Sequence, residues 1–157
     1  VIAAALKTLE GGIYDSAAGE RDTTWATTAE VLPADGGEAG AAFLAKVQAM
    51  AAAIKAKDPD AAAIAGGDWG AAVLGATDYA GKPVPLEVRK RKLRAQGTRM
   101  LVDARVLGGW RKGATAVLVI EGTNGVGNIV RGAQLMELAD GTWTDAGKDV
   151  IEFPPPA

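Results

Sequence analysis

The stretch TAVLVIEGTNGVGNIV, residues 115–130, decides the fold of the C-terminal half. Residues 115–121 form an almost unbroken apolar run, which is typical of a strand buried on both faces. Asn124-Gly125 is a strong signal for a two-residue hairpin turn in which both residues have positive φ. The stretch therefore predicts two antiparallel strands, the second of which begins near Asn128.

Alternation and turn residues extend this predicted sheet in both directions. Apolar and more polar residues alternate over 100–106, which predicts a strand before the apolar run. Asp140-Gly141 is a second hairpin signal, and residues 149–153 are expected to add an edge strand. The C-terminal half is therefore predicted to be an antiparallel β-meander. The Pro-rich tail, residues 154–157, cannot continue a sheet and is expected to be polyproline-like.

The N-terminal half is rich in alanine and predicts one long amphipathic helix, over residues 39–57. Phe43, Val47, Met50 and Ile54 recur at helical spacing and form one apolar stripe, which we expect to be buried. Asp58-Pro59 ends this helix.

The remaining N-terminal segments give weaker signals. Residues 1–14 combine helical spacing with a Gly11-Gly12 stop and stay ambiguous. Residues 15–37 are predicted to form an irregular arm that holds a short strand through Trp25 and Val31. A short helix is expected near residues 69–74. Together these elements predict a single domain, residues 1–157, of the α+β class.

The composition indicates a thin hydrophobic core. Leu, Ile, Val and Phe total 34 of the 157 residues, whereas Ala and Gly together total 54. Small side chains bury little apolar area each, so neighbouring subunits would add to the stability of such a chain. The absence of Cys excludes disulfides and thiolate zinc sites.

Sequence features place the expected location in the cytoplasm or in a virion, and not in a membrane. We find no run of about 18 apolar residues of the kind that spans a bilayer. The N-terminal segment VIAAALKTLE has neither a basic region nor a long apolar stretch, so no signal peptide is evident.

Charge is strongly segregated along the chain, although the net charge is only −2. Residues 82–112 carry 10 basic and 2 acidic groups, whereas residues 1–81 carry 5 basic and 11 acidic groups. Three interpretations compete: the block folds against acids of its own chain, docks an acidic face of another subunit, or binds nucleic acid. The predicted partner-binding residues are Arg89, Lys90, Arg91, Lys92, Arg94, Arg99, Arg111 and Lys112.

Most catalytic devices are missing from the sequence. There is no His, and the single serine, Ser16, lacks the context of a nucleophile elbow. The glycines of residues 121–128 match neither a dinucleotide fingerprint nor a phosphate-binding loop. We therefore predict no catalytic, cofactor-binding or metal-binding residues and no cofactor. The carboxylates of residues 15–22 and the pair Asp58 and Asp60 leave a carboxylate- or metal-dependent enzyme as a remaining alternative.

These observations favour a non-enzymatic structural or assembly subunit that works in an oligomeric particle. A bacteriophage virion component, such as a neck, tail or capsid decoration protein, fits that description. The expected partners are copies of the chain itself or other structural subunits with acidic surfaces, because blocks of opposite charge allow head-to-tail contacts. The first alternative is a small nucleic-acid-binding module that uses residues 89–112.

Overall fold

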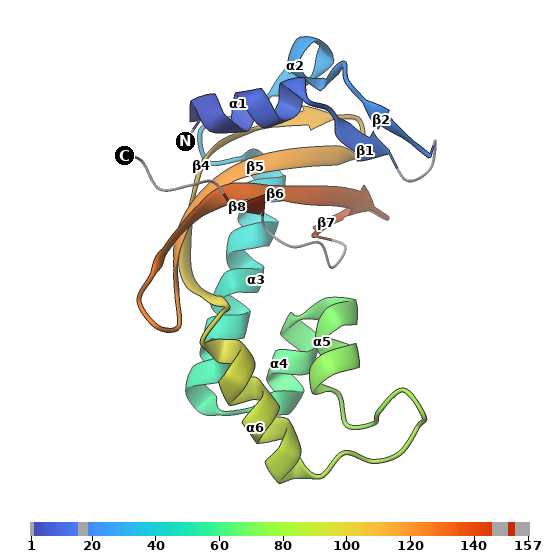
Figure 1. Ribbon diagram of the computed structural model, residues 1–157, viewed down its shortest axis with the longest axis vertical. Helices are drawn as coiled ribbons and strands as arrows, with labels where there is room; N and C mark the ends of the chain where they lie inside the picture. Colours follow the sequence, from blue (N-terminus) through green and yellow to red (C-terminus); the bar gives the residue numbers. More distant parts are fainter. Residues whose placement is uncertain (1, 16–18, 146–150, 153–157) are drawn as a thin grey trace.

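The computed structural model describes residues 2–15, 19–145 and 151–152. Helices dominate the N-terminal half and an antiparallel sheet forms the C-terminal half, which confirms the predicted α+β class (Figure 1). The helices are α1 (Ile2–Glu10), α2 (Trp25–Thr28), α3 (Gly37–Ala56), α4 (Pro59–Ala65), α5 (Gly67–Leu74) and α6 (Leu86–Gly97). The strands are β1 (Ile13–Asp15), β2 (Glu20–Asp22), β3 (Glu30–Val31), β4 (Leu101–Lys112), β5 (Thr115–Asn124), β6 (Ile129–Ala139), β7 (Thr142–Thr144) and β8 (Ile151–Glu152).

The main sheet has the strand order β3-β4-β5-β6-β7, and β8 also pairs with β6. All of these pairs are antiparallel, and β4 to β7 follow one another as the predicted meander. β5 is buried on both faces, as its apolar run predicted. Residues 151–152 supply part of the expected edge strand, whereas the predicted tail, residues 154–157, lies outside the described residues.

The two predicted hairpins form, and the turn at Asp140-Gly141 is the predicted one, whereas the turn after Asn124 differs from the prediction. β5 and β6 are joined by four residues, 125–128, and neither Asn124 nor Gly125 has a positive φ. Gly127 has φ 87° instead, and the side-chain Oδ1 of Asn124 accepts hydrogen bonds from the backbone N–H groups of Val126 and Asn128. The two-residue turn with two positive φ angles is Asp140-Gly141, between β6 and β7.

Helix α3 connects the sheet to the helices below it (Figure 1). Phe43 and Val47 are buried against Leu118 and other residues of one sheet face. Further along the helix, Met50 is buried in a second cluster made by helices, where Ile54 is partly buried. The predicted apolar stripe therefore faces inward along the whole helix. Its first half packs against the sheet, and its second half packs in the cluster made by helices.

The opposite face of the sheet is covered by the N-terminal segment. Residues 2–10 form helix α1, which ends at Gly11-Gly12, and Leu9 is completely buried. Residues 15–37, where we expected an irregular arm, contain short elements: β2, α2 and β3. Trp25 starts α2 rather than lying in a strand, and its indole packs with Leu9 and Val117.

Helices α4, α5 and α6 gather around the C-terminal half of α3 and form what we call the helical lobe (Figure 1). Asp58 begins α4, because its Oδ1 accepts hydrogen bonds from the N–H groups of Asp60 and Ala61. The short helix expected near residues 69–74 is α5. Helix α6 was not predicted from the sequence, and it begins directly after Pro85, whose backbone is extended.

Helix α3 is long and apolar enough, by length and composition alone, to cross a membrane. Its larger apolar side chains, Phe43, Val47 and Met50, are nevertheless buried inside the protein. Its exposed positions carry mostly alanine, together with Glu38, Gln48 and Lys55. The helix therefore packs its large apolar side chains inside its own protein, which favours a protein outside the membrane.

Candidate functional site

Helix α6 carries most of the predicted partner-binding residues, and its buried side fixes its place in the helical lobe. Leu93 is buried in the cluster that contains Met50 and Ala53 of α3. Gly97 permits close packing, since a Cβ there would lie 3.1 Å from a side-chain carbon of Ile54. Glu87 in the first turn and Arg94 in the last turn both suit the helix dipole.

Arg89 is turned into the lobe rather than toward solvent. Its side chain is only 8% exposed. Its Nε donates a hydrogen bond of 3.0 Å to the carbonyl oxygen of Leu74, the last residue of α5. Its Nη2 lies 2.6 Å from Oδ1 of Asp60 on α4. One guanidinium therefore joins three helices, which gives this member of the predicted docking set an internal role.

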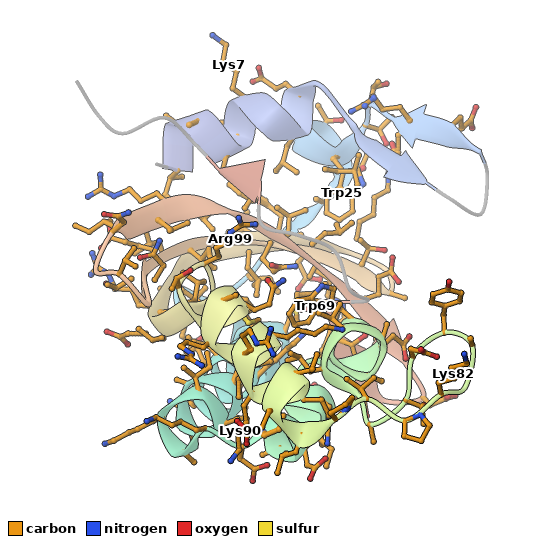
Figure 2. All side chains as sticks on the ribbon, turned by 60° about the horizontal axis from the view of Figure 1, so that its bottom comes forward. Lys7, Trp25, Trp69, Lys82, Lys90 and Arg99 are labelled. Atoms are coloured by element: carbon orange, nitrogen blue, oxygen red, sulfur yellow. The ribbon has the colours of Figure 1, made fainter. Side chains whose placement is uncertain are left out.

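Five of the predicted residues form an exposed set on and just beyond α6, which we call the cationic face. Within the described part of the chain, none of them makes an ion pair or a side-chain hydrogen bond. Figure 2 labels Lys90 and Arg99, which lie toward the two ends of this face. The cationic face consists of Lys90, Arg91, Lys92, Arg94 and Arg99, all of them exposed.

Arg111 and Lys112 lie at the far end of β4 and do not belong to the cationic face. At roughly 3.3 Å per residue, Lys112 is up to about 36 Å along the strand from its first residue. Lys112 Nζ lies 2.5 Å from Oδ2 of Asp22 and also donates to the hydroxyl of Thr24. The guanidinium of Arg111 lies 5.0 Å from the ring centroid of Trp143. The eight predicted residues therefore do not share one surface.

The contact between Lys112 and Asp22 changes the acidity of the carboxyl group. The hydrogen bond from Lys112 is the largest cause that lowers the pKa of Asp22, to about 2. The hydroxyl and backbone N–H of Thr24 act in the same direction, because they also donate to the carboxylate. This ion pair ties the end of β4 to the N-terminal layer.

A second ion-pair group crosses the sheet. Arg105, Glu121 and Arg131 occupy directly opposed positions on β4, β5 and β6. Glu121 accepts hydrogen bonds from Arg131 at 2.7 Å and from Arg105 at 2.7 Å and 3.0 Å. These two guanidinium groups, Arg131 first, lower the pKa of Glu121. Acids of the chain itself therefore neutralise part of the basic block, as one of the three interpretations expected.

Three of the carboxylates noted in the sequence also have structural partners. Asp58 caps α4, Asp60 pairs with Arg89, and Asp22 pairs with Lys112. Lys46 makes an ion pair with Asp145. In residues 2–15, 19–145 and 151–152, no group of three or more His, Cys, Asp or Glu side chains could hold a metal ion.

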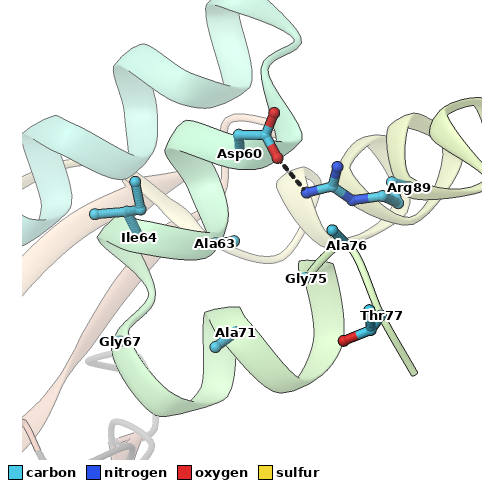
Figure 3. Close-up of a pocket in the computed structure, with 9 residues that line it drawn as sticks. All are labelled: Asp60, Ala63, Ile64, Gly67, Ala71, Gly75, Ala76, Thr77 and Arg89. Carbon is cyan, nitrogen blue, oxygen red and sulfur yellow. Dashed lines mark hydrogen bonds and ion pairs between the residues drawn. The ribbon is translucent and has the colours of Figure 1, made fainter. Parts of the chain in front are cut away.

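The sequence did not reveal a pocket of about 490 Å³ between α4 and α5, which is open to solvent (Figure 3). Its walls are mostly small residues, and the ion pair between Asp60 and Arg89 lies on one side. The available signal was the four-residue spacing of Gly67 and Ala71 on one face of α5, with a third small residue, Gly75, directly after the helix. The pocket is lined by Asp60, Ala63, Ile64, Gly67, Ala71, Gly75, Ala76, Thr77 and Arg89.

A projecting loop, residues 75–85, connects this pocket to α6 (Figure 1). Oδ1 of Asp78 accepts hydrogen bonds of 2.9 Å from the N–H groups of both Ala80 and Lys82. The backbone of Asp78 also donates to the carbonyl of Lys82, and Thr77 pairs with Pro83 in an isolated bridge. These contacts hold the loop in one shape, and at its tip the side chain of Tyr79 is fully exposed.

Comparison with known proteins adds no assignment: no protein-family model matches the chain, and neither a curated protein nor a solved structure is significantly similar to it. The candidate site therefore rests on the geometry of the helical lobe alone.

Proposed function

We propose that this chain is a non-enzymatic assembly subunit that docks an acidic protein surface through the cationic face. The observation that carries the proposal is a contrast within the basic block. Arg89, Arg105 and Lys112 have acidic partners in their own chain, whereas Lys90, Arg91, Lys92, Arg94 and Arg99 have none among the described residues. Clustered, unpaired cations on a rigid helix favour a partner that supplies the missing negative charge.

The layout of charge along α3 supports assembly into a larger particle. Exposed Glu30, Asp35 and Glu38 lie at or before the start of α3, whereas α6 packs near residues 50–54. At about 1.5 Å per residue, Glu38 and Met50 are roughly 18 Å apart along the helix. Acids at one end and cations at the other allow charge-complementary contacts between copies of the chain. A bacteriophage neck, tail or capsid decoration protein is the kind of particle component that we propose.

The test compares two pairs of charge reversals that change the net charge equally. Lys90→Glu with Arg94→Glu alters the cationic face, and Lys7→Glu with Lys55→Glu alters exposed lysines on α1 and α3. Immobilised poly-L-glutamate serves as the acidic probe. We expect wild type and the control pair to be retained at about 0.05 M salt and released near 0.5 M, where the Debye length falls to about 4–5 Å. The α6 pair should elute early even at low salt.

Two results would contradict this proposal. One is equal elution of wild type and the α6 pair. The other is binding of wild type to a DNA duplex at least tenfold more tightly than to poly-L-glutamate of similar length, with the binding lost in the α6 pair. That second result would favour the nucleic-acid-binding module, because phosphate contacts would then dominate the affinity.

A further inference from the structure

The helical lobe carries two neighbouring faces of opposite charge. Residues 58–81, which contain α4 and α5, have four acidic groups and no basic group. Residues 82–99, which contain α6, have seven basic groups and one acidic group. Asp58, Asp60 and Asp68 are exposed, as are the cations of the cationic face. Two copies related by a two-fold axis could therefore oppose each acidic face to a basic one, because an isologous contact matches a surface with itself.

Tyr79 adds a protruding aromatic group to this lobe. Its side chain is fully exposed, although the loop around it is held by the hydrogen bonds of Asp78 and by the bridge between Thr77 and Pro83. A rigid loop loses little conformational freedom on binding, and Tyr is enriched among the residues that dominate interface energies. Tyr79 is therefore suited to act as an anchor.

The pocket between α4 and α5 offers a matching recess. It measures about 490 Å³, and small side chains such as Ala63, Ala71 and Gly75 leave it open (Figure 3). The ion pair between Arg89 and Asp60 forms one wall of the recess. Thr77 lines the pocket and Tyr79 is two residues further along, so their Cα atoms lie at most about 7 Å apart. Tyr79 and the pocket are therefore close enough together on one copy for both to lie within a single small two-fold contact.

We infer that a second copy of this chain is the occupant of the pocket, with Tyr79 of each copy inserted between α4 and α5 of the other. The cationic face of each copy then lies opposite Asp58 and Asp68 of the other. This inference rests on the proposed function, because it uses the same cationic face, and it names the partner: a copy related by two-fold symmetry.

Sedimentation equilibrium tests the contact with variants of both its parts. Wild type should be mostly dimeric at about 100 µM if the Kd is near 10 µM. Tyr79→Ala removes the anchor, and Ala71→Leu fills the recess at an exposed helical position where Leu is well tolerated. Each should weaken the dimer at least tenfold. Val126→Ala, at an exposed apolar residue on the β5–β6 hairpin, is the matched control and should leave the Kd unchanged.

Photo-crosslinking reports the contact itself. Wild-type chain labelled with ¹⁵N is mixed with chain that carries p-benzoylphenylalanine at position 79, so that crosslinks between copies can be recognised by mass. The expected product joins position 79 to a peptide from residues 59–75. The same photo-reactive residue at position 126 should give no such product. A crosslink between copies that joins position 79 to another region of the chain would contradict the assignment of the pocket as the docking site.

The two hypotheses fail in different ways. A monomeric wild type at about 100 µM that is still retained on poly-L-glutamate through α6 would overturn the two-fold contact and leave the proposed function standing. A dimer that depends on Tyr79 but is unaffected by Lys90→Glu with Arg94→Glu would overturn the role of the cationic face in the two-fold contact.

Discussion

Gly125, at the tip of the β5–β6 hairpin, rests against Gly97, the last residue of α6. A Cβ on Gly125 would lie 2.0 Å from the carbonyl oxygen of Gly97, a distance that no side chain can occupy. Gly127, two residues further along the hairpin, faces open space but has φ 87°. The sheet and the helical lobe are therefore joined at a point where one glycine is required for space and a nearby one for backbone conformation.

Asparagine substitutions at these two glycines should separate the two requirements. Gly127→Asn should change the free energy of unfolding by less than about 0.5 kcal/mol, because Asn tolerates positive φ. Gly125→Asn should cost about 1–3 kcal/mol, since the hairpin must move away from α6. Urea denaturation of both variants measures the difference. Equal losses in the two variants would mean that the contact with Gly97 does not constrain the hairpin.

Phe43 should be the most costly position of α3 to truncate. Its side chain is 4% exposed and packs against the sheet beside Leu118. Phe43→Ala should lower the free energy of unfolding by about 3–5 kcal/mol, because it removes buried area and leaves a cavity. Val31→Ala, at a side chain that is 73% exposed, is the control and should change it by less than about 0.5 kcal/mol. A loss below about 0.5 kcal/mol at Phe43 would contradict its assignment to the core.

The parts of the fold that were predicted correctly depend on local patterns. Each of these structures follows from the identity of residues close together in the sequence. They are the strand at 115–121, the turn at 140–141 and the buried helix stripe from Phe43 to Ile54. Helix α6 was missed because its buried row is Arg89, Leu93 and Gly97. An arginine and a glycine at two of these three positions conceal the helical period of apolar residues.

The candidate site was predicted only in part, because the segregation of charge along the chain does not identify which acidic and basic side chains form ion pairs. The two partners of the ion pair between Lys112 and Asp22 are 90 residues apart, and those of the pair between Arg89 and Asp60 are 29 apart. Such pairings depend on how α4, α6 and the N-terminal layer pack. The pocket likewise needs the relative placement of α4 and α5, which the sequence alone did not provide.

The ion pair of Asp22 should give the folded protein a stability that depends on pH in the acid range. The pKa of this carboxyl is about 2 in the folded protein, and an unperturbed Asp has a value near 3.9. Because the folded value is the lower one, the contribution is fully present above about pH 5. It is lost as the pH falls toward 2, since the unfolded chain then takes up the proton first.

Comparison of wild type with Asp22→Asn measures this contribution. The variant should be less stable than wild type at pH 7, and the gap should narrow steadily between about pH 5 and pH 2. Thermal unfolding at a series of pH values follows the gap directly. Asp35→Asn, at an exposed aspartate without an ion pair in the described structure, is the control. A gap that stays constant down to pH 2 would contradict the assignment of the low pKa to Asp22.

Arg89 should contribute to folding rather than to docking, unlike its neighbours on α6. Arg89→Met keeps much of the aliphatic volume but removes both hydrogen bonds, leaving the carbonyl of Leu74 without its donor. The expected loss is about 1–3 kcal/mol, the cost of an unsatisfied buried acceptor. The partner Asp60 is 73% exposed and can be solvated after the change, so the ion pair itself adds little. Chemical denaturation measures this loss.

Two further substitutions determine whether the guanidinium geometry or merely the positive charge matters. Arg89→Lys keeps the charge, but a single ammonium lacks the planar fork that spans Leu74 and Asp60, so it should recover only part of the loss. Lys90→Met removes a charge from the exposed cationic face and should change the free energy of unfolding by less than about 0.5 kcal/mol. Equal free energies of unfolding for Arg89→Met and Lys90→Met would contradict the structural role of Arg89. Arg89 would then be classed again with the predicted docking residues, because its loss would destabilise the protein no more than the loss of a surface charge.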